Sequence, residues 1–96
     1  MTLVILPSAR EDLAAGSDFY EQREPGAGTY YLDSLFSDID SLKQYAGIHR
    51  KVFGYHRLLS KRFPYAIYYS REGETVYVRA VLDCRRNPAW TRERLK

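Results

Sequence analysis

The chain has 96 residues and a mass of 11.2 kDa, and it is expected to form one domain over residues 1–96. Hydrophobic residues make up 45% and charged residues 28%, which excludes an intrinsically disordered chain. No apolar run approaches the ~20 residues of a membrane span and no secretory signal is recognisable, so we expect a cytoplasmic protein without a membrane partner. The single cysteine, Cys84, excludes an internal disulfide and a multi-cysteine zinc site.

The net charge of +3 conceals a strong asymmetry between the two halves of the chain. Residues 1–48 contain three basic and eight acidic side chains, a net charge of −5. Residues 49–96 contain twelve basic and four acidic side chains, a net charge of +8. Such an asymmetry within one domain indicates a polyanionic partner, which can be nucleic acid, the ribosome or an acidic polypeptide. The alternative is a solvated basic surface without a specific partner.

The N-terminal half begins with a predicted strand and a first helix. Residues 2–6 are apolar and rich in β-branched side chains, which is typical of a strand. Ser8 and Glu11 have the spacing of a capping box, in which each side chain bonds a free backbone N–H at the start of a helix. Gly16 lies within this helix and costs ~1 kcal/mol relative to alanine, so the helix depends on packing. The Pro25-Gly26 pair is expected to end it.

A second helix is predicted over residues 29–45, with Gly47 as its stop. Apolar side chains recur there at the spacing of one helical face. Each of them that is buried contributes ~1.5–3 kcal/mol to the stability of the fold. The members of this face are Leu32, Leu35, Phe36, Ile39 and Leu42.

The C-terminal half changes to a period of two, which predicts strands at residues 56–60, 65–70 and 75–83. The short glycine-containing link at 71–74 predicts a hairpin between the last two strands. In the last strand, one face is expected to carry Val76, Val78, Ala80 and Leu82, and the other Tyr77, Arg79, Val81 and Asp83. Residues 89–95 are expected to form a short terminal helix.

This order of elements predicts an α+β fold. It consists of an N-terminal strand, a helical hairpin packed on one face of a mostly antiparallel sheet of three to four strands, and a short C-terminal helix. The other face of the sheet is then left to water or to a partner.

Several classes of enzyme are not supported by the sequence. It contains no glycine-rich phosphate loop and no nucleophile elbow. His49 and His56 are too far apart for the close helical spacing of a zinc protease, and no metal or cofactor is expected. His56 shares a strand face with Leu58 and is interpreted as a core histidine. Cys84 is interpreted as a packed or incidental thiol rather than a nucleophile, although the arginines beside it would lower its pKa if it were exposed.

Basic side chains from separate segments form the most informative pattern. They come from the strand at 56–60 and its exit, and from the last strand and its end: Arg57, Lys61, Arg62, Arg79, Arg85 and Arg86. These side chains are expected to meet on one surface if the two strands lie close together in the sheet. Guanidinium groups hold phosphates through paired hydrogen bonds. Five interleaved aromatic residues either stack on unpaired bases or pack in the core: Tyr55, Tyr65, Tyr69, Tyr77 and Trp90.

Two segments of the C-terminal half carry a family resemblance, namely RFPYAIYY at 62–69 and VRAVLDCRRNP at 78–88, with a glycine hairpin between them. Together they resemble the RelE/ParE superfamily, the toxins of bacterial type II toxin–antitoxin systems. The N-terminal half resembles the helical hairpin of this family in PSA at 7–9, YEQ at 20–22, PG at 25–26 and Gly28. The resemblance covers almost the whole chain, and its C-terminal part is the more specific.

The resemblance implies a small toxin that is held inactive by a cognate acidic antitoxin, which fits the +8 half of the chain. In RelE-like members the toxin enters the ribosomal A site and cuts mRNA. In ParE-like members it binds DNA gyrase and traps it on cleaved DNA. The shared fold does not choose between these targets.

Metal-free RNA cleavage requires a base, an acid and positive charge at the phosphorane. Arg57, Lys61, Arg62, Arg85 and Arg86 are the candidate catalytic residues that would hold the phosphate. The proton carrier is unassigned among Lys61, His56, a tyrosine and Asp83, because arginine does not take up a proton near pH 7. Asp83 stands where many relatives have histidine, and the tail has Trp90 but no tyrosine or histidine.

This departure favours gyrase inhibition, with Arg79, Trp90, Arg92 and Arg94 as candidate binding residues. A ribosome-dependent endoribonuclease is the first alternative. A degenerate member that binds only its antitoxin is the second.

Overall fold

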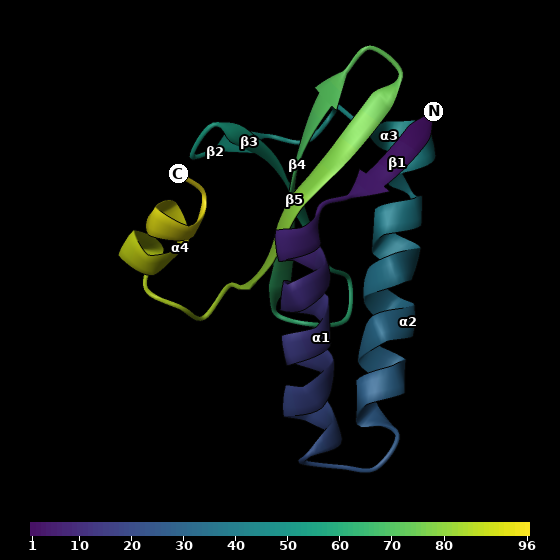
Figure 1. The fold of residues 1–96 in the computed structure, drawn as a ribbon, viewed down its shortest axis with the longest axis vertical. Coiled ribbons are helices and arrows are strands. Elements are labelled where there is room, and N and C mark those ends of the chain that lie inside the picture. Colours follow the sequence, from purple (N-terminus) through teal and green to yellow (C-terminus); the bar gives the residue numbers. More distant parts are fainter.

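The computed structural model describes all residues from 1 to 96 (Figure 1). Its elements in chain order are β1 (Thr2–Ile5), α1 (Pro7–Glu21), α2 (Ala27–Asp40), α3 (Leu42–Tyr45), β2 (Lys51–Val52), β3 (Tyr55–Leu59), β4 (Tyr65–Glu72), β5 (Thr75–Asp83) and α4 (Pro88–Arg94). The α+β class with a helical hairpin and a short C-terminal helix is confirmed. No helix combines the length with the hydrophobicity that spanning a bilayer requires.

The strands form one five-stranded sheet in the order β1-β5-β4-β3-β2. β1 runs parallel to β5, and every other neighbouring pair is antiparallel. The sheet has one strand more than the upper limit predicted, and the strand not foreseen is the two-residue β2. Phe53 and Gly54 join β2 to β3 with φ angles of 54° and 87°. Positive φ at both positions suits a tight hairpin, in which Gly54 is a usual turn residue and Phe53 is not.

A bulge in β5 changes which of its side chains face the helical hairpin. The pairing with β4 skips Arg79, which has no partner residue on that strand. The helical-hairpin face carries Val76, Val78 and Val81, and the opposite face carries Ala80 and Leu82. The strict alternation predicted for this strand is therefore wrong after Val78, because one extra residue reverses a period of two.

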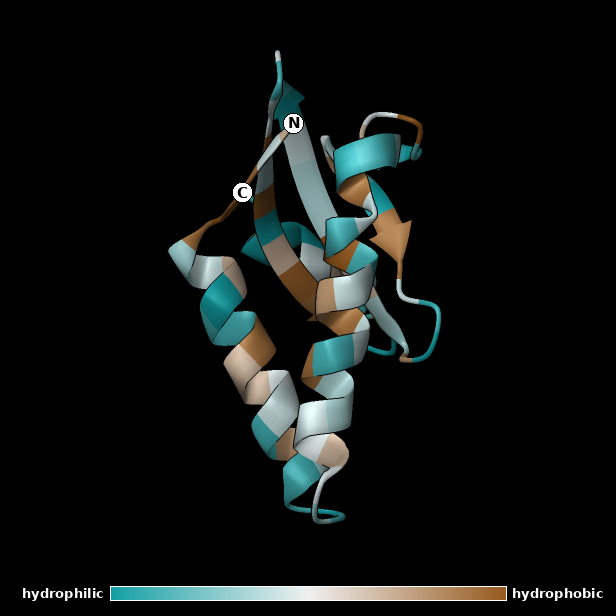
Figure 2. Cartoon of the chain, turned by 90° about the vertical axis from the view of Figure 1, so that its right-hand side faces the viewer, coloured by the Kyte–Doolittle hydropathy of each residue, from teal (hydrophilic) through white to brown (hydrophobic).

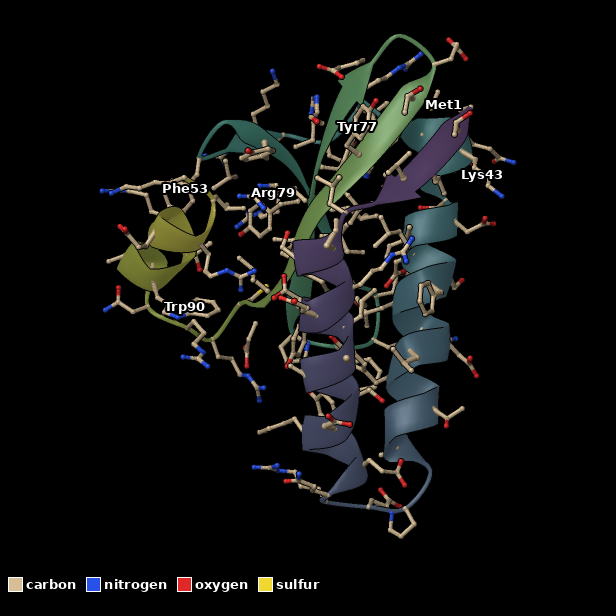
Figure 3. The ribbon with its side chains drawn as sticks, in the orientation of Figure 1. Met1, Lys43, Phe53, Tyr77, Arg79 and Trp90 are labelled. Carbon is tan, nitrogen blue, oxygen red and sulfur yellow. The ribbon has the colours of Figure 1, made fainter.

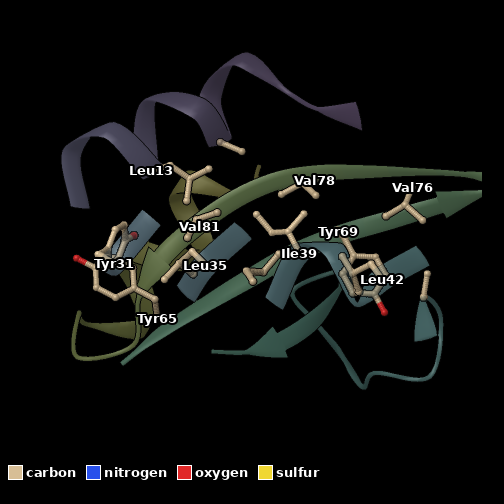
Figure 4. Packing of buried hydrophobic residues seen from close by; sticks show 13 residues of the cluster. Leu13, Tyr31, Leu35, Ile39, Leu42, Tyr65, Tyr69, Val76, Val78 and Val81 are labelled. Carbon is tan, nitrogen blue, oxygen red and sulfur yellow. The ribbon is translucent and has the colours of Figure 1, made fainter. Parts of the chain in front are cut away.

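Two apolar clusters lie on the two faces of the sheet. The larger cluster is formed by the helices and the strands, and it includes Leu35, Ile39, Ile67 and Val78 (Figure 4). Hydrophobic residues gather along β1 and in the strands behind the helices, whereas the loops are mainly hydrophilic (Figure 2). The smaller cluster lies beneath α4 and contains Ala66, Tyr68, Ala80, Leu82 and Leu95. The expectation that this face is left to water or to a partner is therefore wrong where α4 covers it.

The helix predicted over residues 29–45 is interrupted at Ser41 and forms α2 and α3 instead. Four members of its predicted apolar face lie in or against the larger cluster, but the side chain of Phe36 is 45% exposed. Tyr31 takes the buried place that Phe36 was expected to fill, with no exposed surface. The start of α2 is fixed from α1, because the Glu21 carboxylate accepts hydrogen bonds from the backbone N–H groups of Gly26 and Gly28.

Tyr31 also explains the glycine within α1. A Cβ atom on Gly16 would overlap the Tyr31 ring and its hydroxyl group, so only glycine leaves room for the close approach of the two helices. The Tyr31 hydroxyl is buried without a hydrogen-bond partner. Burial raises the pKa of Tyr31 far above its ordinary value. The close contact between Gly16 and Tyr31 is therefore part of the packing on which this helix was predicted to depend.

Ser8 does not cap α1, and the predicted capping box is wrong. Leu6 is the N-cap residue, and no side chain bonds the first N–H groups of the helix. The Ser8 hydroxyl donates to the carbonyl oxygen of Arg79 at 2.9 Å and accepts from the Arg79 guanidinium at 2.9 Å. The pairing of β1 with β5 ends at Val78. The bulge carbonyl therefore has no strand to pair with, and Ser8 supplies the missing donor.

Asp12 supplies the matching acceptor one helical turn later. Its carboxylate accepts the backbone N–H of Val81 at 3.1 Å and forms an ion pair with Arg94 at 2.9 Å. The Asp12 side chain is only 11% exposed. One carboxylate therefore connects α1, the unpaired edge of β5 and α4.

His56 has the role expected from its strand position. Its ring stacks on Tyr69 at a centroid distance of 5.1 Å, and its Nδ1 lies 2.6 Å from the carbonyl oxygen of His49, which makes Nδ1–H the donor. The Tyr69 hydroxyl accepts the N–H of Gly47 at 2.9 Å and also bonds Nδ1 of His49. His56 is half-buried rather than enclosed in the core, but its ring is stacked and hydrogen-bonded, as expected of a structural histidine.

Replacing Asp12 with alanine is expected to destabilise the protein by about 1–3 kcal/mol, because the Val81 N–H loses its acceptor and Arg94 loses its partner. Chemical denaturation monitored by circular dichroism measures this free energy of unfolding. Asp18→Ala on the same helix is the matched control, since Asp18 is exposed, and it is expected to change stability by less than about 0.5 kcal/mol. Equal losses in the two variants would contradict the bridging role of Asp12.

Two tyrosine variants test the buried hydroxyl groups of the core. Tyr31→Phe removes a hydroxyl without a partner and is expected to leave stability unchanged or to raise it by about 1 kcal/mol. Tyr69→Phe removes a hydroxyl that binds Gly47 and His49, so it is expected to lower stability by about 1–2 kcal/mol. Thermal or chemical unfolding curves of the two variants and the unaltered protein measure these changes in stability. A larger loss in Tyr31→Phe than in Tyr69→Phe would contradict the assignment.

Candidate functional site

The C-terminal helix is capped by Asn87 at its start and held against the rest of the fold at its end. The Asn87 side chain caps α4 by accepting the N–H of Ala89 at 2.8 Å, and Pro88 suits the first helical position. Leu95 is buried in the smaller cluster. Arg94 is tied to Asp12 of α1. The helix therefore presents its remaining side chains in a fixed orientation.

Arginine side chains lie over two aromatic rings on and beside α4. The Arg86 guanidinium lies over the Trp90 ring at 4.3 Å and that of Arg94 at 5.7 Å. The Arg92 guanidinium lies 5.3 Å from the ring of Phe53 in the β2–β3 turn. Phe53 and Trp90 lie on either side of α4 (Figure 3). We call Phe53, Arg86, Trp90, Arg92 and Arg94 the α4 surface.

An open cavity of about 270 Å³ lies between α1, the end of β5 and α4. Its polar lining includes Asp12, Tyr65, Asp83, Arg86 and Arg94, with Trp90 on the same wall. The two aspartates balance the two arginines, so the lining of this cavity has no net charge.

Asp83 and Arg85 form a closed pair at the end of β5. The guanidinium donates to the two carboxylate oxygens through Nε and Nη2, both at 2.9 Å, and the Arg85 backbone N–H donates at 2.8 Å. These hydrogen bonds hold the pKa of Asp83 below its ordinary value, although partial burial opposes them. The carboxylate is therefore a weak base at neutral pH, and Arg85 is not free to bind a phosphate without breaking this pair.

The tyrosines and the cysteine beside this pair, unlike the Asp83 carboxylate, stay protonated at neutral pH. Burial raises the pKa of Tyr65. Burial also raises the pKa of Tyr68, on the face toward α4, although the nearby Arg57 guanidinium partly opposes this increase. Burial likewise raises the pKa of the Cys84 thiol, and the effect of Arg57 is smaller. Cys84 is an exposed residue, but the lowered pKa expected from its arginine neighbours is wrong. No three His, Cys, Asp or Glu side chains are placed to hold a metal ion.

The remaining predicted site residues occupy different surroundings. Arg57 pairs across the sheet with Tyr68, so it lies on the face toward α4. The Arg79 guanidinium donates to Ser8 and, at 3.3 Å, to the carbonyl oxygen of Lys96, and it thus connects the bulge to the C-terminus. The strands that carry Arg57 and Arg79 are separated by β4 and are not neighbours.

Lys61 and Arg62 do not join the α4 surface. They lie in the β3–β4 loop and line a cavity with Ser34, Ser37 and Asp38 of α2. This cavity belongs to the helical-hairpin face of the sheet, whereas α4 covers the opposite face. The structure therefore brings Arg86, Trp90, Arg92 and Arg94 together and places Lys61 and Arg62 elsewhere.

An apolar groove of about 510 Å³ lies between β1 and the helical hairpin. It is lined by Leu3, Ile5, Arg10, Leu13, Ala14, Leu32 and Phe36. A neighbouring hollow along β1 adds Asp33 and Asp40 on the α2 side. The outer edge of β1 has no neighbouring strand. This groove is an apolar surface in the acidic half of the chain, bordered by one arginine and two aspartates.

Three features of these surfaces were not foreseen from the sequence. Asp12 was not singled out because its partners, Val81 and Arg94, are far away in the chain. Phe53 was missed with the turn that carries it, although Gly54 after a β-branched and aromatic pair was a usable signal for a hairpin. The groove was missed because Phe36 was assigned to the core.

Comparisons with known proteins agree with this architecture. Residues 3–88 match the family model described as the ParE toxin of the type II toxin–antitoxin system parDE. Among solved structures, the chain is similar to a chain of a chromosomal ParDE toxin–antitoxin system from P. aeruginosa, with a TM-score of 0.76 and 23% sequence identity. The match covers 84% of this chain and 92% of that one, and it supports the fold. A search of the curated proteins gave no match.

The family model spans all elements from β1 to the first residue of α4, which includes the sheet, the helical hairpin and the Asp83–Arg85 pair. The resemblance to RelE/ParE toxins seen in the sequence is thereby confirmed. The chain belongs to the ParE toxin family of type II toxin–antitoxin systems.

Proposed function

We propose that this toxin arrests growth by inhibiting DNA gyrase through its α4 surface. Membership of the family implies a cognate antitoxin as the partner that neutralises it. The observation that carries the choice of target is the closed Asp83–Arg85 pair. It occupies the place where a nuclease of this superfamily would need a proton carrier.

Cleavage of RNA by its own 2′-hydroxyl group requires a base that is partly deprotonated near neutral pH. The lowered pKa makes Asp83 a poor proton acceptor, and the raised pKa values of Tyr65 and Tyr68 keep these hydroxyl groups protonated. His56 is directed toward the helical-hairpin face, where it stacks on Tyr69. The side chains around the α4 surface therefore favour binding over proton transfer.

The composition of the α4 surface is that of a protein-binding surface. Tryptophan and arginine dominate the residues that contribute most to protein–protein affinity. Trp90 is half-buried and lies near two guanidinium groups, those of Arg86 and Arg94, so its ring is oriented before a partner arrives. Asp12 and Asp83 neutralise Arg94 and Arg85, which leaves Arg86 and Arg92 as the free cations of this region. An acidic protein surface with an apolar pocket fits this arrangement.

The antitoxin is assigned to the apolar groove beside β1. A segment of the antitoxin seated there would bury the exposed ring of Phe36 together with the half-buried Leu32. The acidic border at Asp33 and Asp40 favours basic residues at the corresponding positions of that segment. Its acidic residues then pair with the basic half of the toxin, as the charge asymmetry of the sequence predicts.

The gyrase assignment is tested with Arg86→Ala. Inhibition of supercoiling by purified gyrase is expected to require at least about tenfold more of the variant toxin, since truncating a central arginine of an interface commonly costs ~2 kcal/mol. Lys43→Ala is the matched control, because Lys43 is also an exposed cation but lies on α3, on the helical-hairpin face of the sheet. This control is expected to inhibit gyrase like the unaltered toxin.

Cells that express the toxin from an inducible promoter report on the alternative target. Mapping of mRNA cut sites on translating ribosomes is expected to show no cuts that depend on the toxin. Cuts at preferred codon positions with normal supercoiling would contradict the proposal and support an endoribonuclease. Normal supercoiling, intact mRNA and unaffected growth would instead identify a degenerate member that binds only its antitoxin.

The groove assignment is tested with Phe36→Asp. This substitution places a charge in the apolar groove and is expected to weaken binding of the cognate antitoxin at least about tenfold in a calorimetric titration. Tyr45→Asp is the control, because Tyr45 has a similarly exposed aromatic ring on α3 but does not line the groove. Both side chains are solvent-exposed, so the melting temperatures are expected to change little. Equal affinities of the two variants would exclude the groove as the antitoxin site.

A further inference from the structure

A polar cavity of about 320 Å³ lies between α2 and the β3–β4 loop, which passes beside this helix (Figure 1). Its five lining residues are Ser34, Ser37, Asp38, Lys61 and Arg62, and none of them is hydrophobic. Neither the gyrase proposal nor the antitoxin groove uses these side chains. The volume is within the range of small-ligand sites, ~300–1,000 Å³.

Two of the lining side chains are buried without full compensation. The Ser34 side chain belongs to a residue that is 4% exposed, and its hydroxyl has no hydrogen-bond partner. Asp38 is 6% exposed, and its carboxylate accepts one hydrogen bond, from the Ser60 hydroxyl at 2.8 Å, but forms no ion pair. Buried hydroxyl and carboxylate groups are normally satisfied by partners. The remaining acceptor capacity of Asp38 is therefore available to a ligand, whereas the enclosed Ser34 hydroxyl is reached only after a small movement of the side chains around it.

The mixture of charges restricts the chemistry of that ligand. Lys61 and Arg62 provide donors for an anionic group, and Arg62 matches the geometry of phosphate oxygens. The Asp38 carboxylate repels a bare anion but accepts hydrogen bonds from hydroxyl groups. A simple phosphate ion leaves Asp38 uncompensated, and a neutral sugar leaves the two cations without a partner. A ligand that uses all of these groups carries hydroxyl donors and a phosphate on one small framework.

We propose that this cavity binds the phosphorylated ribose of a ribonucleotide. The ribose hydroxyl groups donate to Asp38 and bond Ser34, and the phosphate is held by Lys61 and Arg62. Carboxylates are the usual acceptors for ribose hydroxyl groups, and the 2′-hydroxyl distinguishes a ribonucleotide from its deoxy counterpart. The lining contains no aromatic ring, so the base stays outside the cavity and is not selected. The ligand is either a free ribonucleotide or a residue of an RNA strand.

The test is a nuclear magnetic resonance titration of the full chain with adenosine 5′-monophosphate. Backbone amide signals of residues 34–38 and 61–62 are expected to shift and to saturate below about 10 mM. The 2′-deoxy analogue and inorganic phosphate are each expected to bind at least about tenfold more weakly, the loss that follows removal of a hydrogen bond to a charged group. A hexauridylate titration identifies the source: tighter binding than the mononucleotide supports an RNA strand, and equal or weaker binding supports the free nucleotide.

Variants separate ligand binding from folding. Lys61→Ala combined with Arg62→Ala is expected to weaken nucleotide binding at least about tenfold, because it removes both donors to the phosphate. The fold is expected to stay intact, because both residues are exposed and lie outside the regular elements. Ser34→Ala is expected to weaken binding while it leaves the melting temperature unchanged or higher, because the lost hydroxyl has no partner in the protein. Lys43→Ala on α3 is the control for a lost surface charge and is expected to bind normally.

Four results would overturn the proposal. They are the absence of saturable shifts up to about 10 mM, equal affinity for the deoxy analogue, equal affinity for inorganic phosphate, and shifts centred on α4 that survive the double substitution. None of these results bears on gyrase inhibition, which is measured at the other face of the sheet. Failure of either proposal is thus distinguishable from failure of the other.

Discussion

The architecture of this toxin depends on how the free edge of β5 is satisfied once β1 has ended. β1 pairs with β5 only as far as Val78, and the backbone groups beyond that point would be left without partners. Side chains from the first turns of α1 replace the missing strand: Ser8 donates to the Arg79 carbonyl, and Asp12 accepts the Val81 N–H. The helix is consequently fixed in position along the sheet. Because Asp12 also binds Arg94, the same contact decides where α4 lies.

The bulge at Arg79 has a second consequence, which is the division of the core. An uninterrupted β5 would direct Ala80 and Leu82 toward the helical hairpin, where Val81 now packs. The extra residue sends both to the opposite face, and this creates the apolar patch that receives Leu95 of α4. The patch is small, so α4 depends on polar attachments as well as on burial. The α4 surface is therefore built on a strand irregularity rather than on regular pairing.

Periodicity in the sequence was sufficient to predict most elements but not their exceptions. The bounds of β5 agree with the prediction, and the helical period located α1 and α2. The roles of Ser8 and Arg79 were misjudged and that of Asp12 was missed, because Ser8 binds Arg79 across 71 residues of chain and Asp12 binds Val81 across 69. The Asp12–Arg94 contact spans 82 residues. Local spacing contains no information on such partners. The same limit applies to Lys61 and Arg62, whose charges suggested a phosphate site beside Arg57 although the loop folds toward α2.

The two faces of the sheet impose a condition on how an antitoxin neutralises this toxin. A segment seated only in the groove beside β1 leaves Trp90 and Arg86 exposed, since α4 lies on the opposite face. α1 is the element that both regions share, because Leu13 lines the groove while Asp12 holds α4. Neutralisation from the groove therefore requires one of two things. Either the antitoxin continues around the edge of the sheet to cover Trp90, or its binding moves α1 and releases Arg94.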